Sequence, residues 1–244
     1  MEHIIQHLNS HHIKLQDKYS LSQPVPSITM DNFLPDNFAK RMFVEAQSIP
    51  DSLWSTFTRK DSLMKECVKL EHMPVARELL AQLHSSEGLH WLEALTGISG
   101  IIPDPYITGA GYSKSWRGDS LKIHTDFNWN EKLKLHRACA LIIYLTPDWK
   151  PEYNGAFEFW DANKTECVRS VDCLFNRAII WNDHKRGFHG YPKPIECPES
   201  MHRTTFRLFF YTSNSTYKQD DRPHRSLYWY DKEVDVPYDI PSRK

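Results

Sequence analysis

A histidine and an aspartate lie two residues apart in the run LKIHTDFNW, as His124 and Asp126. Alternate residues of a β-strand share one face of the sheet, so a strand here would present both side chains side by side. An imidazole nitrogen and a carboxylate oxygen in that arrangement suit one metal ion. His-x-Asp is a short motif that also arises by chance, so the hypothesis depends on a third ligand elsewhere.

His189 is the candidate third ligand, at the end of the run IIWNDHKRGFHGYP. Gly187 and Gly190 lie close to it and allow the tight backbone geometry that a ligand in a short strand needs. Two histidines and one carboxylate fit the facial triad of non-haem iron(II) oxygenases, which leaves coordination positions open. His184 competes for this role, but the polar run NDHK around it is typical of an exposed turn.

An arginine follows the third ligand, at the start of the predicted strand RTTFRLFFY. Strand alternation places Arg203, Thr205, Arg207 and Phe209 on one face. An inward arginine needs an anionic partner, because an unpaired buried guanidinium is strongly destabilising. A dicarboxylate co-substrate would supply one, held by the planar fork of Arg203 and the Thr205 hydroxyl. Arg207 is the alternative cation for that role.

The elements that must position these residues form an α+β, mainly β chain. Residues 1–26 are polar and are predicted to be an adaptable N-terminal arm, followed by one catalytic domain over 27–212. Helix formers predominate over about 36–95, including the stretch 62–95, which reads as two helices. From about 97 to 212, short β-branched and aromatic runs alternate with turn residues. The number of these strands predicts a jelly roll, or double-stranded β-helix, with supporting N-terminal helices. Residues 213–244 are predicted to be a C-terminal tail packed on the core.

Composition limits the classes of function. The chain has 244 residues, 40% hydrophobic and 25% charged, with a formal net charge of −1, so it lacks the basic excess of proteins that bind duplex nucleic acid. We see no apolar run long enough to cross a membrane and no secretory leader, so no membrane partner is expected. Its five cysteines form no C-x-x-C pair, which favours a reducing, cytoplasmic location over a disulfide framework.

Several longer blocks of the sequence resemble those of a known family. They are GAGY at 109–112, GDSLKIHTDFNW at 118–129, HRACALIIYLTPDW at 136–149, NGAFEFWD at 154–161, RGFHGYP at 186–192 and CPESMHRTTFRLFFYT at 197–212. Their order and spacing resemble the iron(II)/2-oxoglutarate-dependent dioxygenases, in the branch similar to prolyl 4-hydroxylases. The likeness extends over about residues 95–212 and is specific for superfamily and fold, much less for substrate.

The resemblance implies roles for individual residues. His124, Asp126 and His189 would hold Fe(II) as catalytic metal ligands, and Arg203 with Thr205 would bind the distal carboxylate of 2-oxoglutarate. Molecular oxygen would be the co-substrate, with ascorbate as a supporting reductant. Tyr112 and Tyr144 are further candidates for 2-oxoglutarate contact, and core packing is the equal alternative for both.

The aspartate also bears on the reaction type. Relatives that halogenate carry a small residue in place of this carboxylate, so Asp126 favours hydroxylation of a peptidyl prolyl or small-molecule substrate. Asn154-Gly155 departs from the Gly-Gly pair of many relatives; asparagine also tolerates a positive φ, so the change concerns turn geometry.

Two other classes of function remain open at this point. Two histidines and one carboxylate also bind Zn(II) with an open position for water, as in zinc hydrolases. A jelly roll can also serve as a non-enzymatic binding module, because a fold does not fix a function. The first alternative leaves Arg203 unexplained, and the second leaves the ordered set of three ligands and arginine unexplained.

Overall fold

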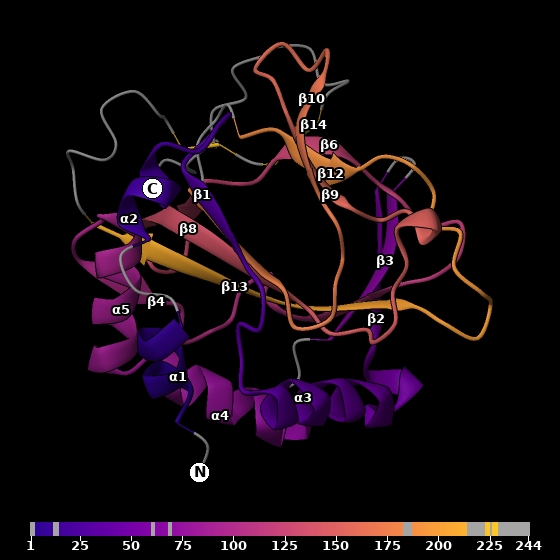
Figure 1. Cartoon of the computed structure of the whole chain (residues 1–244), viewed down its shortest axis with the longest axis horizontal. Helices are drawn as coiled ribbons and strands as arrows, with labels where there is room; N and C mark the ends of the chain where they lie inside the picture. The colour runs from indigo at the N-terminus through magenta and orange to yellow at the C-terminus, as the bar shows by residue number, and fades with distance from the viewer. Residues whose placement is uncertain are drawn as a thin grey trace, which may run out of the picture.

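Two antiparallel β-sheets and a set of helices make up the structure, a computed structural model of the chain (Figure 1). It describes residues 3–11, 15–59, 62–67, 70–182, 187–213, 223–224 and 226–228. The fold is a double-stranded β-helix, as the sequence predicts.

The larger sheet has the strand order β1-β11-β8-β13-β5-β3-β2, with β4 paired to β13 and β7 paired to β8. Its strands are β1 (Ser27–Met30), β2 (Ser55–Arg59), β3 (Ser62–Cys67), β4 (Ile101–Pro103), β5 (Gly111–Ser115), β7 (Trp129–Asn130), β8 (Leu135–Tyr144), β11 (Ala178–Asn182) and β13 (Arg203–Thr212). The two longest, β8 and β13, pair along most of their length at the centre of this sheet.

The smaller sheet has the order β10-β9-β12-β6-β14. Its strands are β6 (Leu121–Thr125), β9 (Phe157–Trp160), β10 (Cys167–Val171), β12 (His189–Tyr191) and β14 (Leu227–Tyr228). Both histidines of the predicted triad therefore lie in this sheet, on the neighbouring strands β6 and β12.

Four of the five described α-helices lie along the side of the large sheet that faces away from the small sheet, and the short helix Gln16–Ser20 lies beside β1 (Figure 1). The helices are α1 (Ile4–His11), α2 (Gln16–Ser20), α3 (Asp36–Ser48), α4 (Pro74–Leu83) and α5 (Ser86–Thr96), with short 3₁₀ turns at Asp51–Leu53, Leu70–His72 and Pro151–Tyr153. The predicted break between two helices is confirmed: the Ser85 side chain caps α5 by accepting from the Gly88 amide, and Gly97 ends it with a φ of 70°. None of the described helices is long and apolar enough to cross a membrane.

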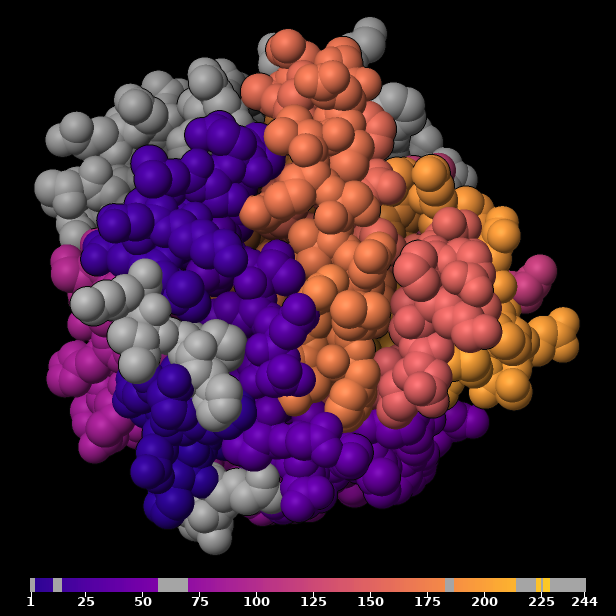
Figure 2. Space-filling model, viewed as in Figure 1, coloured from indigo at the N-terminus to yellow at the C-terminus, as the bar shows by residue number. Residues whose placement is uncertain are grey.

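The N-terminal arm predicted for residues 1–26 is not adaptable where the structure describes it. Ile4 and Leu8 on α1 and Tyr19 on α2 are almost fully buried in the hydrophobic core. Ile4 and Leu8 are one helical turn apart, so they share the face that packs on the core. Figure 2 shows the indigo atoms of the N-terminal part of the chain lying against orange atoms from later in the sequence, and β1 pairs with β11.

A second prediction is wrong for the start of the 62–95 stretch. Ser62–Cys67 form strand β3, which pairs with β2 on one side and β5 on the other. A hairpin partner at Ser55–Arg59, whose run TFT is β-branched and aromatic, overrides the weak helix propensity of 62–67.

The alternation predicted for β13 is confirmed. Arg203, Thr205, Arg207 and Phe209 line a cavity between the two sheets. Phe206 and Phe210 point the other way: Phe206 packs on Tyr112, and Phe210 packs edge-on against His84 at the end of α4. β13 thus presents polar Arg203, Thr205 and Arg207 to the cavity, and its Phe206 and Phe210 face the helices.

Most of the predicted tail lies outside the described residues. Within its described part, β14 pairs with β6, and Tyr228 and His224 are buried. His224 donates its amide to the Asn128 side chain at 2.7 Å, and the Asn128 amide donates to the His224 carbonyl at 3.3 Å. These two hydrogen bonds hold the described C-terminal residues beside the end of β6.

Candidate metal and co-substrate site

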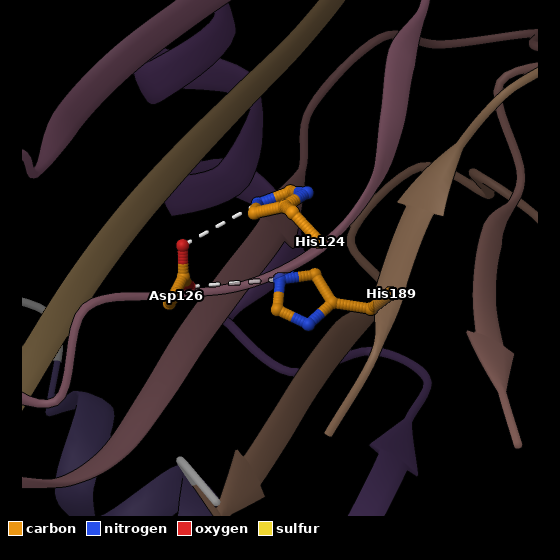
Figure 3. A group of neighbouring side chains, drawn as sticks. All are labelled: His124, Asp126 and His189. Atoms are coloured by element: carbon orange, nitrogen blue, oxygen red, sulfur yellow. Dashed lines mark ion pairs between the residues drawn. The ribbon is translucent and has the colours of Figure 1, made fainter. Parts of the chain in front are cut away.

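The three predicted metal ligands meet at one point on the inner face of the small sheet (Figure 3). β6 and β12 pair in a register that sets His189 opposite His124, and Asp126 follows directly after β6. One ligand atom from each of the three residues lies within 4.8 Å of the other two. Gly190 permits this close pairing, because a Cβ there would lie 2.6 Å from the Leu121 carbonyl oxygen.

Each imidazole is held by a backbone carbonyl. The Nδ1 of His124 lies 2.8 Å from the Lys122 oxygen, and the Nδ1 of His189 lies 2.7 Å from the Gly187 oxygen. A carbonyl oxygen only accepts, so each Nδ1 carries the proton and each Nε2 keeps its lone pair. Both Nε2 atoms face the Asp126 carboxylate, at 3.4 Å for His124 and 3.6 Å for His189.

The electrostatics keep His189 and Asp126 in the protonation states that a metal cation needs. Burial lowers the pKa of His189 and so favours its neutral form. Burial alone would raise the pKa of Asp126, but the Arg137 guanidinium and the two imidazoles hold it well below the ordinary value. Two neutral imidazoles and one carboxylate are donors that bind Fe(II) and Zn(II) alike, so the ligand chemistry fits a divalent metal.

Aromatic rings pack against the two imidazoles. Phe157 on β9 stacks on His189 at 5.1 Å between ring centroids, and Trp181 meets the same imidazole edge-on at 5.3 Å. Tyr228 on β14 stacks on His124. The ligand rings are therefore fixed by packing as well as by hydrogen bonds.

Arg203 lies in the same cavity with its side chain buried. Its Nε donates to the Cys173 sulfur at 3.2 Å, and its Nη2 donates to the Tyr144 hydroxyl at 3.4 Å. The guanidinium carbon also lies 4.4 Å from the centre of the Tyr191 ring. Burial raises the pKa of Cys173, Tyr144 and Tyr191, so all three neighbours are neutral. Among the described residues, Arg203 makes no ion pair with a carboxylate, and its charge is available to an anionic ligand.

The remaining predicted contacts divide between the cavity and the opposite face. Thr205 lines the cavity, and its hydroxyl lies 2.6 Å from that of Ser113. Arg207 lines the same cavity, so geometry keeps both arginines near the site. His184 lies outside the described residues.

Tyr112 is not part of this site, contrary to the prediction. Its hydroxyl donates to the Glu45 carboxylate of α3 at 2.8 Å, on the helix side of the large sheet. Glu45 in turn accepts from the amides of Val75 and Ala76 at the start of α4. The residue on β5 that faces the cavity is the next one, Ser113, because neighbours in a strand point to opposite faces.

Arg137 is the site residue that the sequence reasoning missed. It lies on β8, and its Nη1 donates to Asp126 Oδ2 at 2.9 Å. Strict alternation from Tyr144 would direct residue 137 toward the helices. A register shift in the pairing of β8 with β13 sets Arg137 opposite Tyr211 and turns it inward.

Comparison with known proteins agrees with this geometry. Residues 110–211, which include the triad and both arginines, match the 2OG-Fe(II) oxygenase superfamily. The chain carries a 2OG-Fe(II) oxygenase domain. The enzymes of this superfamily use Fe(II) and 2-oxoglutarate, and the triad of this domain fits the metal. No curated protein sequence matches the chain significantly.

Solved structures share the fold of this oxygenase. A prolyl-4-hydroxylase from Pseudomonas putida is 12% identical, with a TM-score of 0.57 over 81% of this chain and 97% of that chain. A prolyl 4-hydroxylase from Phytophthora capsici is 14% identical, with a TM-score of 0.61 over 87% of this chain and 67% of that chain. HygX from Streptomyces hygroscopicus, solved with nickel and 2-oxoglutarate bound, is 8% identical, with a TM-score of 0.53 over 82% and 87% of the two chains. At these identities the likeness concerns the fold.

Proposed function

We propose that the protein is a hydroxylase that binds Fe(II) through His124, Asp126 and His189 and binds 2-oxoglutarate through Arg203. The observation that carries the proposal is the pair of Nδ1–carbonyl hydrogen bonds, which leaves both Nε2 atoms facing one carboxylate. When bound, Fe(II) and 2-oxoglutarate supply the oxidising chemistry, which couples decarboxylation of 2-oxoglutarate to succinate and CO₂ with hydroxylation of a C–H bond.

The chain's own residues would position the metal and 2-oxoglutarate and exclude water from them. The three ligands would hold the metal ion beside the cavity, and a triad of this kind leaves coordination positions for co-substrates. Arg203, with Tyr144 and Thr205 beside it, would hold the distal carboxylate of 2-oxoglutarate in a bidentate contact. The apolar lining from Phe157, Trp181 and Ile142 excludes water around these charged groups.

The substrate proposal stays at the level of class. The solved relatives are named as prolyl hydroxylases in two cases, and HygX has also been solved with hygromycin B bound. We therefore propose a peptidyl prolyl residue or a small molecule as the substrate. The described Cys139, Cys167, Cys173 and Cys197 are free thiols, which supports a reducing compartment and a cytoplasmic location as part of the proposal.

The test needs no substrate. Fe(II) is added under anaerobic conditions, then 2-oxoglutarate, and the visible charge-transfer band of the chelate is recorded. We expect the band in the wild type and its loss in His189→Ala. If metal binds and no band forms, the zinc hydrolase becomes the better interpretation. If no metal binds, the protein is a binding module, and both outcomes would overturn the proposed function.

A further inference from the structure

The Arg137 guanidinium is buried against the metal-binding carboxylate. Its side chain has 0% exposure, and its contact to Asp126 Oδ2 is an ion pair of 2.9 Å. Arginine is among the residues least often fully buried, and a buried arginine requires a partner. The register shift in β8 brings this side chain to the cavity face, where it meets Asp126.

Two phenylalanine rings pack against the guanidinium. Its central carbon lies 3.8 Å from the centre of the Phe127 ring and 4.0 Å from the centre of the Phe209 ring. The two rings meet edge to face, with centroids 5.8 Å apart and planes 70° apart, so they contact the guanidinium from two adjacent sides. Its Nη1 donates to Asp126. The two rings and the ion pair therefore restrict the orientation of Arg137 and of the carboxylate it contacts.

The two carboxylate oxygens consequently differ. Oδ2 accepts from Arg137 at 2.9 Å and lies 3.6 Å from the His189 Nε2, while Oδ1 lies 3.4 Å from the His124 Nε2. We infer that Arg137 is a positioning residue that reserves Oδ2 and leaves Oδ1 alone to bind the metal. This inference rests on the proposed function.

The number of Asp126 oxygens that bind the metal determines how many coordination positions are left for 2-oxoglutarate and molecular oxygen. Two imidazoles and one oxygen fill three of the six positions of an octahedral ion, and three stay open. 2-Oxoglutarate needs two of them and oxygen needs one. If Asp126 used both oxygens, one of those three positions would be lost. Arg137 thus protects co-substrate binding rather than metal binding.

The distinguishing experiment measures metal and co-substrate affinity separately in Arg137→Met. The Mn(II) dissociation constant is read from the electron paramagnetic resonance signal of free Mn(II), without turnover. The 2-oxoglutarate dissociation constant is read from the anaerobic charge-transfer band at saturating Fe(II). We expect Mn(II) to bind as tightly as in the wild type or more tightly. We expect 2-oxoglutarate to bind about tenfold more weakly or worse, the scale typical of losing an outer-sphere partner.

Arg177→Met is the matched control, because Arg177 forms an arginine–aspartate pair with Asp31 away from the cavity. Neither constant should change in this control. Two results would overturn the inference: unchanged 2-oxoglutarate affinity in Arg137→Met, or a parallel loss of both affinities, which indicates a merely structural role. If circular dichroism shows that Arg137→Met does not fold, Arg137→Gln decides by the same criteria, because it removes the charge and keeps a polar side chain in the buried position. A wild type without the band would instead contradict the proposed function.

Discussion

Tyr228 lies flat against His124, with ring centroids 5.0 Å apart and ring planes 17° apart. The two residues come from strands that pair directly, with Tyr228 opposite His124 in the register of β14 on β6. A residue more than one hundred positions away in the chain thus packs against a candidate metal ligand.

The first prediction concerns this stack. Tyr228→Ala should weaken Mn(II) binding by about 10- to 100-fold, because the ligand ring loses its support. Tyr228→Phe should bind Mn(II) as the wild type does, because the ring face makes the contact. The measurement is an anaerobic Mn(II) titration. Tyr106→Ala is the control, since that ring is 54% exposed and outside the cavity. Equal affinity of Tyr228→Ala and wild type would disprove the role.

The second prediction separates the two cavity arginines. Arg203→Met should raise the 2-oxoglutarate dissociation constant on the order of 100-fold, because truncating one member of a buried charge pair costs ~2–5 kcal/mol. Arg207→Met should have a smaller effect, because Arg203 is the more buried of the two. Titration of the charge-transfer band measures both. A larger loss of 2-oxoglutarate affinity in Arg207→Met than in Arg203→Met would show that Arg207 binds the distal carboxylate instead.

The third prediction follows from the position of Tyr112. Tyr112→Phe should leave 2-oxoglutarate binding unchanged, because its hydroxyl contacts Glu45 on the helix side. The free energy of unfolding should fall by about 1.5–3 kcal/mol, the usual contribution of a hydrogen bond to a charged group. Urea denaturation and the band titration check the two parts. If Tyr112→Phe bound 2-oxoglutarate more weakly and kept the free energy of unfolding of the wild type, Tyr112 would have to belong to the co-substrate site.

The fourth prediction concerns pH and His202. This imidazole stacks on Trp116 at 5.1 Å, and burial, with Lys114 nearby, lowers its pKa to about 4. The unfolded chain, with a histidine pKa of about 6.5, binds the proton first as pH falls. The contribution of His202 to stability is therefore present above pH ~6.5 and is lost as pH falls toward 4.

Comparison with His202→Phe tests this pH dependence. The variant cannot take up the proton, so its melting temperature should fall less between pH 6.5 and 4 than that of the wild type. Parallel pH profiles of the two proteins would show that His202 does not contribute.

The sequence predicts the triad well because strand alternation and strand pairing suffice to place it. His124 and Asp126 share a face by spacing alone, and β13 shows the predicted alternation of Arg203 with its apolar neighbours. Alternation alone does not determine which of the two faces of a strand lines the cavity. The prediction that Tyr112 contacts 2-oxoglutarate is therefore wrong, because its hydroxyl lies on the helix side of β5.

Two further supports of the site were not predictable from local pattern. Arg137 reaches Asp126 because of a one-residue irregularity in β8, and no residue type in HRACALIIY signals such a bulge. Tyr228 reaches His124 because a short distant strand adds to the edge of the small sheet. Both depend on tertiary packing, which local propensity does not encode.

The strand order also has a consequence for how the protein folds. β13 pairs with β8 and β5, and β1 pairs with β11, so the large sheet joins segments far apart in the chain. Such contacts form only after long loops close, which slows folding to roughly milliseconds to seconds. Stopped-flow tryptophan fluorescence measures the rate, and refolding in microseconds would contradict it. The two candidate histidine ligands lie on β6 and β12 of the small sheet, which also pair across a long stretch of chain, so we expect metal uptake during refolding to be a late event.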